Sequence, residues 1–346
     1  MRHYGLDVHQ KMTTVCWLDD ETGEISRSQA VPTAHLVSHL ASLAGPKRLI
    51  LECGGQSRFL ARRLQSLAGA EVIVVDASKA RRALEGLHSG KKTDKWDARG
   101  LARLSSQGCC EAMAVWLPDP ATADLRALTR TRQALVEQCT ALQNQVRAFL
   151  RAQGLACEST ELLSQKAQRQ LAELAALLSP IGQECLARLR QTLVSLKRES
   201  QALEKQLGQW SAQDASCQRL MTIPGCGPLL ATMIVAEIGA PARFAEAKHL
   251  RSYAGLTPSV YQSGERSYSG RLSKGNTHLK YALVMLAQHF TWQSDFQDSR
   301  WKRSYYRCLN RHGPQPAKVA LARHLCDVIF ALLRDECAFQ AQLLAA

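Results

Sequence analysis

The 346-residue chain has no C-x-x-C pair, although it carries 12 cysteines. The only cysteines close together are the neighbours Cys109 and Cys110. Structural zinc sites use paired cysteines at C-x-x-C spacing, and small secreted domains use cysteines as a disulfide framework. In a chain of this length the pattern excludes both, so we expect reduced, mostly buried thiols in a cytosolic protein.

Long hydrophobic runs are also missing. The N-terminal residues, Met1–Asp7, lack the apolar stretch of a signal peptide. The longest apolar stretch, Leu229–Ala240, contains Glu237 and is too short to span a bilayer. No polybasic cluster follows a membrane segment. We therefore expect no membrane partner and a cytoplasmic location.

Acidic residues are scarce: 30 Asp and Glu stand against 44 Lys and Arg, and the net charge is +14. From Ser216 onward the chain has 16 basic and 8 acidic residues, so this third holds most of the excess. Hydrophobic residues make up 46% and charged residues 21%, which is typical of a globular protein. The length predicts two or three domains, and the positive charge predicts nucleic acid as the partner.

The first hundred residues alternate between two hydrophobic periods. Strands are expected at 3–8, 12–19, 25–31, 48–53 and 71–76, and helices at 32–43, 57–67, 78–87 and 94–107. Three strands followed by alternating helices and strands predict a mixed sheet covered by helices. By analogy at the level of the fold, we expect an α/β, ribonuclease H-like domain over residues 1–115.

A basic stretch, Lys91–Arg99, carries two aspartates three positions apart, Asp94 and Asp97. On a helix these residues share a face, so both carboxylates can point into one cleft. An ordinary alternative is that Thr93 or Asp94 caps the helix while Asp97 favours the dipole of its first turn.

Two more carboxylates lie on expected strands. Asp7 is in the first strand and Glu52 ends the strand at 48–53, both among apolar neighbours. A carboxylate there is costly unless something neutralises it, and divalent cations take oxygen ligands. We predict a metal site formed by these two residues with Asp94 and Asp97. Pairing with an arginine such as Arg99, or exposure to water, remains the alternative.

The middle of the chain, residues 116–215, is rich in Leu, Ala, Gln and Arg, with 12 basic and 10 acidic residues. Leucines recur at spacings of three and four, as in Leu186, Leu189, Leu193 and Leu196. This pattern predicts long amphipathic helices that form a coiled coil. It fits an oligomerisation arm and an intramolecular helical hairpin equally well.

The last part, residues 216–346, is expected to be mainly α-helical. Ile223–Pro228 precedes an apolar helix and resembles a helix-hairpin-helix turn, in which Gly225 and Gly227 let backbone amides approach a phosphate. The alternative is a plain Gly/Pro loop. Nearer the C-terminus, further basic residues suit contacts with a nucleic-acid backbone: Arg300, Lys302, Arg303, Arg307 and Arg311.

A polar segment, Gly255–Asn276, is read as a loop rich in Gly and Ser, with Arg266, Arg271 and Lys274 interleaved. Hydroxyls among cations suit phosphate binding, and one serine could attack phosphorus. The alternative is a solvated loop whose serines form turns. The residues alone do not choose among the candidate serines, which are Ser263, Ser267, Ser269 and Ser273.

These motifs occur in one order along nearly the whole chain. Together they resemble the DEDD transposases of the insertion-sequence one-ten family, including its eleven-eleven branch, whereas the middle helices match in character only. The matching segments are Gly5-Leu6-Asp7-Val8, Glu52 before a small residue and a glycine, Lys92-Thr93-Asp94-x-x-Asp97-Ala98-Arg99, Ile223-Pro224-Gly225-x-Gly227, Ala254-Gly255-Leu256-Thr257-Pro258, Ser263-Gly264 and Ser273-Lys274-Gly275.

The resemblance implies a RuvC-like N-terminal domain whose Asp7, Glu52, Asp94 and Asp97 bind Mg²⁺. It places a nucleophilic serine in a Tyr-x-Ser-Gly segment, which here identifies Ser263. The implied activity is a DNA recombinase that moves its own insertion sequence. The residues expected to contact nucleic acid are Lys91, Lys92, Arg99, Gly225, Gly227, Arg266, Arg271 and Lys274.

Members of the family use a non-coding RNA from the flank of the element, which pairs with both target and donor DNA. They act as dimers that assemble into tetramers. The expected partners are therefore donor and target DNA, a guide RNA and further copies of the chain, on the bacterial nucleoid. Two rival interpretations are a Holliday-junction nuclease that uses two metals and water, and a non-catalytic nucleic-acid-binding protein.

Overall fold

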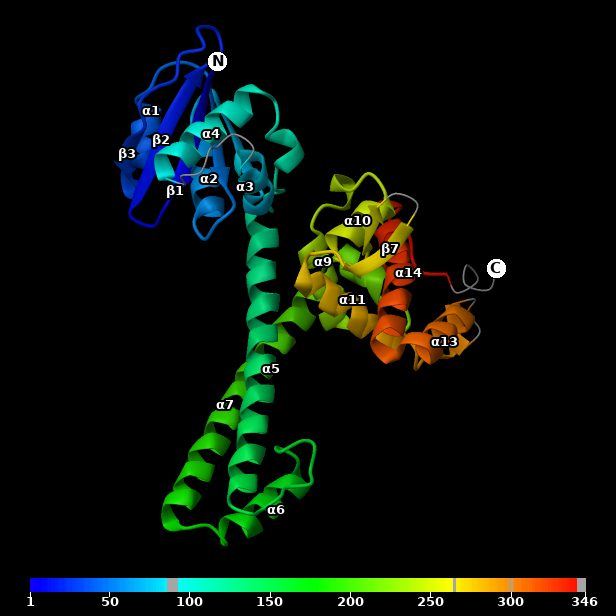
Figure 1. The fold of residues 1–346 in the computed structure, drawn as a ribbon. Helices are drawn as coiled ribbons and strands as arrows, with labels where there is room; N and C mark the ends of the chain where they lie inside the picture. The colour runs from blue at the N-terminus through cyan, green and yellow to red at the C-terminus, as the bar shows by residue number, and fades with distance from the viewer. Residues whose placement is uncertain (86–92, 264–265, 298, 300, 341–346) are drawn as a thin grey trace. The chain divides into compact units, whose positions relative to one another are not determined.

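The structure, a computed structural model, describes residues 1–85, 93–263, 266–297, 299 and 301–340, with the backbone alone for 259–271. The chain divides into two compact units, Met1–Pro118 and Asp119–Ala346, whose elements are labelled in Figure 1. A division into three domains at residues 116 and 216 stays a prediction. Among the described helices, none combines the length and apolar character needed to cross a membrane.

The first unit is built on a five-stranded sheet in the order β3-β2-β1-β4-β5. Its central strand β1 pairs antiparallel with β2 and parallel with β4, which confirms the expected mixed sheet. The third strand is shorter than expected, because Ile25 makes only an isolated bridge with Leu18. The strands are β1 (Arg2–Val8), β2 (Met12–Asp19), β3 (Gln29–Pro32), β4 (Lys47–Glu52) and β5 (Ala70–Val75).

Helices cover both faces of this sheet. On one face, α1 (Leu36–Ala41) and α2 (Ser57–Gln65) pack on the buried side chains of Tyr4 and Leu6. On the other, α3 (Ala77–Glu85) and α4 (Asp94–Ser106) share a core with Ile50 of β4. Successive side chains of a strand point to opposite faces, so His3, Gly5 and Asp7 face α4.

The backbone of α4 touches β1 at Gly5. A Cβ atom at this position would lie 1.9 Å from the carbonyl oxygen of Ala98, so no other residue fits without displacing the helix. Near the start of β1, His3 Nδ1 lies 2.7 Å from Ser105 Oγ in the last turn of α4. The helix therefore runs antiparallel to β1, and its N-terminus lies at the end of the strand that carries Asp7.

In the second unit, the two long helices pack against each other as an antiparallel pair (Figure 1). Arg132 near the start of α5 pairs with Glu204 near the end of α7, and Leu150 near the end of α5 shares a core with Leu186. The chain thus buries its leucine seam internally, as the hairpin interpretation expects. An added role in oligomerisation stays a prediction.

Each long helix begins with the same local signal. The Asp119 side chain accepts from the Thr122 amide at the start of α5, and Ser179 accepts from the Gly182 amide at the start of α7, each directly before a proline. The elements of the unit are α5 (Pro120–Ala152), α6 (Gln165–Ala175), α7 (Pro180–Ser211), α8 (Ala215–Met221), α9 (Pro228–Ile238), α10 (Ala247–Tyr253), β6 (Pro258–Ser263), β7 (Arg266–Leu272), α11 (Thr277–Phe290), α12 (Ser294–Gln297), α13 (Trp301–His312) and α14 (Pro314–Arg334).

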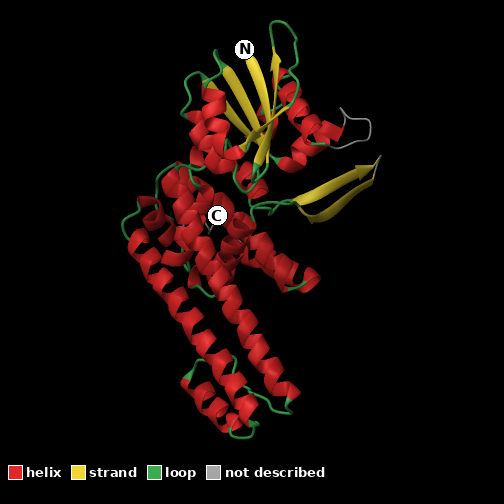
Figure 2. Cartoon of the chain, turned by 90° about the vertical axis from the view of Figure 1, so that its left-hand side faces the viewer, coloured by secondary structure: helices red, strands yellow, loops and turns green. Residues whose placement is uncertain are grey.

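The segment Gly255–Asn276, expected to be a loop, contains an antiparallel hairpin formed by β6 and β7 (Figure 2). The correction has a simple cause. Serine and glycine dominate the composition, but the segment also holds Val260, Tyr261 and Tyr268, which are strand-forming residues. The expected serine and arginines therefore lie on a regular scaffold.

All twelve cysteines are free, and six of them are buried, which is half rather than most. Burial raises the pKa of Cys110, Cys217, Cys226 and Cys326 to about 12. These thiols behave as small apolar side chains of the core.

Replacing Gly5 with alanine should lower the free energy of unfolding of the first unit by about 2–4 kcal/mol, because the new methyl group overlaps the α4 backbone. Urea denaturation measures the loss. Gly55→Ala is the matched control, since nothing lies within 4 Å of a Cβ there. Equal stability of the two variants would contradict the packing described.

Candidate metal and nucleic-acid sites

The parallel strands β1 and β4 bring Asp7 and Glu52 to one edge of the sheet. Their register pairs Leu6 with Leu51, so each carboxylate lies one residue beyond a paired position. Residues in register on neighbouring strands point to the same face, here the face covered by α4. Glu52 is half-buried at the end of its strand.

The first turn of α4 supplies two more carboxylates. Thr93 occupies the N-cap position without a side-chain cap hydrogen bond, and Asp94 and Asp97 follow in the first turn. The positive end of the helix dipole stabilises both carboxylates. Thr93 gives no side-chain cap, so only the dipole part of the alternative is seen. That part does not compete with the predicted metal site, because the same helix end lies beside Asp7.

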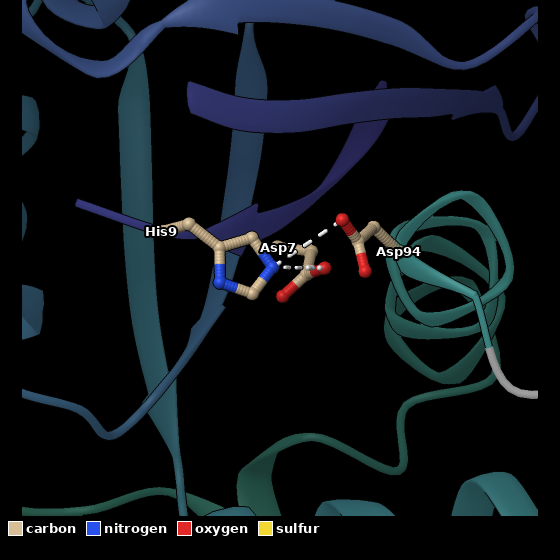
Figure 3. Close-up of side chains that lie close together, drawn as sticks. All are labelled: Asp7, His9 and Asp94. Carbon is tan, nitrogen blue, oxygen red and sulfur yellow. Dashed lines mark ion pairs between the residues drawn. The ribbon is translucent and has the colours of Figure 1, made fainter. Parts of the chain in front are cut away.

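Three side chains from these elements converge (Figure 3). One ligand atom each of Asp7, His9 and Asp94 lies within 4.8 Å of the others. His9 Nε2 lies 3.2 Å from Asp7 Oδ2 and 3.5 Å from Asp94 Oδ2. Asp7 is only 18% exposed, whereas Asp94 is 63% exposed, so one ligand is held firmly and the other opens to solvent.

The electrostatics of the cluster identify Asp7 as its strained member. Burial raises the pKa of the Asp7 carboxyl, the charges of Asp94 and Asp97 raise it further, and His9 offsets part of the shift. Like-charged carboxylates that disfavour one another's ionised form are stabilised by a shared cation. Asp97 lies in the same first turn of α4 as Asp94.

The donor set fits a divalent cation. Carboxylate oxygens suit Mg²⁺, Ca²⁺ and Mn²⁺, and an imidazole adds affinity for transition metals. Asp7 and Asp94 would hold the ion, with Asp97 and Glu52 at the margin of the site. Within the described part of the chain, these last two residues lie outside the 4.8 Å group.

His9 was not among the residues expected from the sequence. The signal for it was present, because in an extended chain residues two apart point the same way, and His9 follows Asp7 by two. Asp7 and His9 become part of a three-residue site only because α4 brings Asp94 beside them.

Of the three basic residues of this unit that were expected to contact nucleic acid, the structure describes only Arg99. Lys91 and Lys92 lie outside the described residues. The Arg99 guanidinium lies 5.8 Å from the Trp96 ring, and its Nε has no hydrogen-bond partner among the described residues. Both side chains line a shallow hollow with Arg27 and Lys95. Cations beside an exposed aromatic ring suit a nucleic-acid strand.

The turn expected to bind phosphate joins α8 to α9. Gly225 has a φ of +82°, and a Cβ there would lie 3.0 Å from the His289 carbonyl carbon. This glycine is therefore required by the turn and by close packing. Gly227 is the N-cap residue of α9, and nothing lies within 4 Å of a Cβ placed there. Of the two glycines, only Gly227 leaves room for a ligand.

The structure describes only the backbone of the segment that carries Ser263. Ser263 is the last residue of β6 and pairs with Arg266, the first residue of β7. Arg271 lies near the end of the same strand, and Lys274 is exposed just beyond it. Of the other candidate serines, Ser273 has a buried Oγ with no hydrogen-bond partner among the described residues.

The pKa of Asp7 predicts a pH-dependent effect of Asp7→Asn. Because the pKa is raised in the folded chain, the ionised carboxylate destabilises the fold above that pKa, and the penalty vanishes at acid pH, where Asp7 is protonated in both states. Without metal, the variant should be more stable than the wild type at neutral pH, and the difference should vanish below about pH 3.

Added MgCl₂ should stabilise the wild type more than Asp7→Asn, because only the wild type keeps both carboxylates. Urea unfolding at several pH values, with and without the salt, measures both effects. Glu21→Gln, in an exposed loop of the same unit, serves as the control. An Asp7→Asn variant that is less stable than wild type at neutral pH would contradict the assigned cost.

Two family models match the chain. The DEDD transposase model of the IS110 type matches residues 4–153, and the model described as the transposase IS116/IS110/IS902 family matches residues 217–307. The first match contains the carboxylate cluster. The second contains the α8–α9 turn and the hairpin of β6 and β7, which carries Ser263. Both matches therefore cover regions that the geometry singles out.

Relatives match over nearly the full length. The transposase for insertion sequence element IS1111A of Coxiella burnetii is 26% identical over 341 residues, covering 95% of this chain and 88% of that protein. A probable family 20 transposase of Pseudomonas aeruginosa is 26% identical over 344 residues, covering 97% and 98%. The transposase for IS1328 of Yersinia enterocolitica is 26% identical over 284 residues, covering 81% of each chain. The chain is therefore an insertion-sequence transposase, a DNA-recombining enzyme, and belongs to the IS110 family.

Proposed function

We propose that this transposase moves its own insertion sequence by Mg²⁺-dependent cutting and rejoining of DNA through a covalent serine–DNA intermediate. The observation that carries the metal-dependent part is the convergence of Asp7, His9 and Asp94 at one end of the sheet. The strand order, with β1 central and parallel to β4, supports a RuvC-like fold for the first unit.

The carboxylates of the first unit form the proposed Mg²⁺ site. Asp7 and Asp94 would hold Mg²⁺, with Glu52 and Asp97 completing the tetrad. Bound there, the ion supplies Lewis-acid polarisation of the scissile phosphate. His9 Nε2 lies within ion-pair distance of both carboxylates and limits their freedom before the ion binds. The positive end of the α4 dipole, at the first turn of the helix, stabilises the ionised carboxylates of Asp94 and Asp97.

Ser263 is the proposed nucleophile. Its Oγ attacks phosphorus, an Oγ–P bond forms, and the bond from phosphorus to the departing deoxyribose oxygen breaks. The serine proton leaves to solvent, and the departing oxygen takes a proton. The resulting ester keeps the bond energy of the phosphodiester, so rejoining needs no ATP. Arg266, Arg271 and Lys274 would neutralise phosphate charge around it.

A row of arginines on α13 supports a nucleic-acid surface in the second unit. Arg303, Arg307 and Arg311 are all exposed and follow one another at four-residue spacing. They share one helix face, and the helix contains no acidic residue. Like charges at this spacing destabilise a helix, and a phosphate backbone offsets the repulsion.

RNA guidance and assembly rest on family membership. We propose that a non-coding RNA pairs with donor and target DNA, and that dimers assemble into tetramers. The helical arm offers apolar surface for a second copy, because Leu177 and Ile181 near its tip are 71% and 76% exposed. Leu177 lies in the connection before α7 and Ile181 in the first turn of α7, and neighbouring exposed apolar residues suit a protein partner.

Ser263→Ala should abolish the covalent DNA adduct and the recombined product, because the Oγ nucleophile is removed. A denaturing gel of the reaction with labelled element ends measures the adduct. Ser267→Ala and Ser269→Ala, on the neighbouring strand, are matched controls that should keep it. Full activity of Ser263→Ala would refute the assignment and favour metal-dependent hydrolysis by water.

Replacing Arg303, Arg307 and Arg311 with glutamine should weaken DNA binding and reduce the slope of log K against log salt by about 1 for each phosphate that is no longer neutralised. Fluorescence anisotropy at several salt concentrations measures the slope. Arg188→Gln is the control, since Arg188 is also exposed but pairs with Glu184 on α7. An unchanged slope in the triple variant would remove α13 from the interface.

A further inference from the structure

The hairpin of β6 and β7 is joined to the rest of the unit by backbone hydrogen bonds at its base. Its two strands pair with each other, and no other described helix or strand packs extensively against them. Figure 2 shows the hairpin projecting from the helical part of the second unit. The direction in which Ser263 is presented therefore depends on the residues where the hairpin begins and ends.

The base of the hairpin is closed by backbone contacts. The Ser273 amide donates to the Thr257 carbonyl at 2.8 Å, and the Asn276 amide donates to the Tyr253 carbonyl at 2.7 Å. A Cβ at Gly275 would lie 2.4 Å from the Gly255 nitrogen. The two ends of the hairpin are thus in direct backbone contact, and a shift of either end moves both strands.

Asn276 joins this base to the interior of the unit. Its Oδ1 accepts from the His278 and Leu279 amides and so caps α11. Its Nδ2 donates to Glu237 Oε2 at 2.7 Å and to the Tyr253 hydroxyl at 3.0 Å. One side chain therefore caps a helix with its oxygen and reaches a buried carboxylate with its amide.

Glu237, in the last turn of α9, is only 1% exposed. Arg130 of α5 donates to both of its oxygens, at 2.7 and 2.8 Å. Burial raises the pKa of Glu237, but hydrogen bonds from Arg130 and Asn276 outweigh that effect and leave it lowered. Arg126 of α5 holds the adjacent backbone by donating to the Ala236 and Glu237 carbonyls.

We propose that Glu237 is a positioning residue that couples α5, through Arg130 and Asn276, to the base of the hairpin carrying Ser263. The inference deepens the proposed function and rests on the nucleophilic role of Ser263. Its physical basis is that Glu237 Oε2 accepts from both Arg130 and Asn276. A movement of the arm helix therefore changes the anchor of the hairpin, and with it the direction of the serine.

Asn276→Ser separates this role from a general loss of structure. Serine keeps an N-cap oxygen for α11, but it has no amide to reach Glu237. The hairpin, residues 258–272, should then exchange its amide hydrogens faster. Adduct formation should slow by about tenfold while the Kd for DNA changes by less than about twofold, because misorientation affects the reaction more than binding.

Gln133→Ala is the matched control. It removes the Gln133–His278 hydrogen bond, which also joins α5 to α11 at 2.8 Å but does not involve Glu237. Hairpin exchange and adduct rate should stay at wild-type values. A second test variant, Arg130→Lys, keeps the charge but cannot donate to both carboxylate oxygens in the same fork geometry, and it should reproduce the effect of Asn276→Ser.

The outcomes separate the two proposals. If Ser263→Ala forms the adduct, the proposed nucleophile is wrong, while hairpin exchange still tests the coupling. If Ser263→Ala abolishes the adduct but Asn276→Ser and Arg130→Lys match the wild type in exchange and rate, the positioning role of Glu237 is wrong. Equal effects of Gln133→Ala and Asn276→Ser would also overturn it, since any α5–α11 contact would then suffice.

Discussion

The contact of α4 with β1 at Gly5 determines the geometry of the first unit. A helix normally stays a side chain away from a sheet, whereas here the missing Cβ lets the Ala98 carbonyl touch the strand. That contact fixes how far α4 is from the sheet, and the His3–Ser105 contact fixes its direction. The aspartates of the first helical turn therefore reach the end of β1, where Asp7 points toward them.

The carboxylates of Asp7 in the first unit and Glu237 in the second have opposite electrostatic surroundings. Burial and, to a lesser extent, the neighbouring carboxylates raise the pKa of Asp7, so the folded chain carries an unfavourable interaction at this point. Glu237 is more deeply buried, yet it receives a full set of donors and its pKa is lowered. A charge left under strain is typical of a ligand site, whereas a fully compensated charge is typical of a structural anchor.

The sequence predicted the first unit well, because strand and helix periods differ and Gly5, Asp7 and Glu52 fall at readable positions. It predicted a loop where β6 and β7 form a hairpin, since serine and glycine outweighed the strand-forming Val260 and Tyr261. His9 was missed because its role depends on Asp94, which is distant in sequence. Glu237 was noted only as a charge in an apolar stretch, because its partners Arg130 and Asn276 lie over thirty residues away on either side.

The closed base of the hairpin formed by β6 and β7 divides the chain's evolutionary freedom. The two strands pair with each other, and no other described helix or strand contacts their backbone extensively, so substitutions within them can accumulate more freely than at the base. Substitutions at Gly255, Gly275 or Asn276 alter a crowded junction at once. Mobile elements that diverge in their DNA ends can therefore change the hairpin around Ser263 while keeping the same backbone junction at its base.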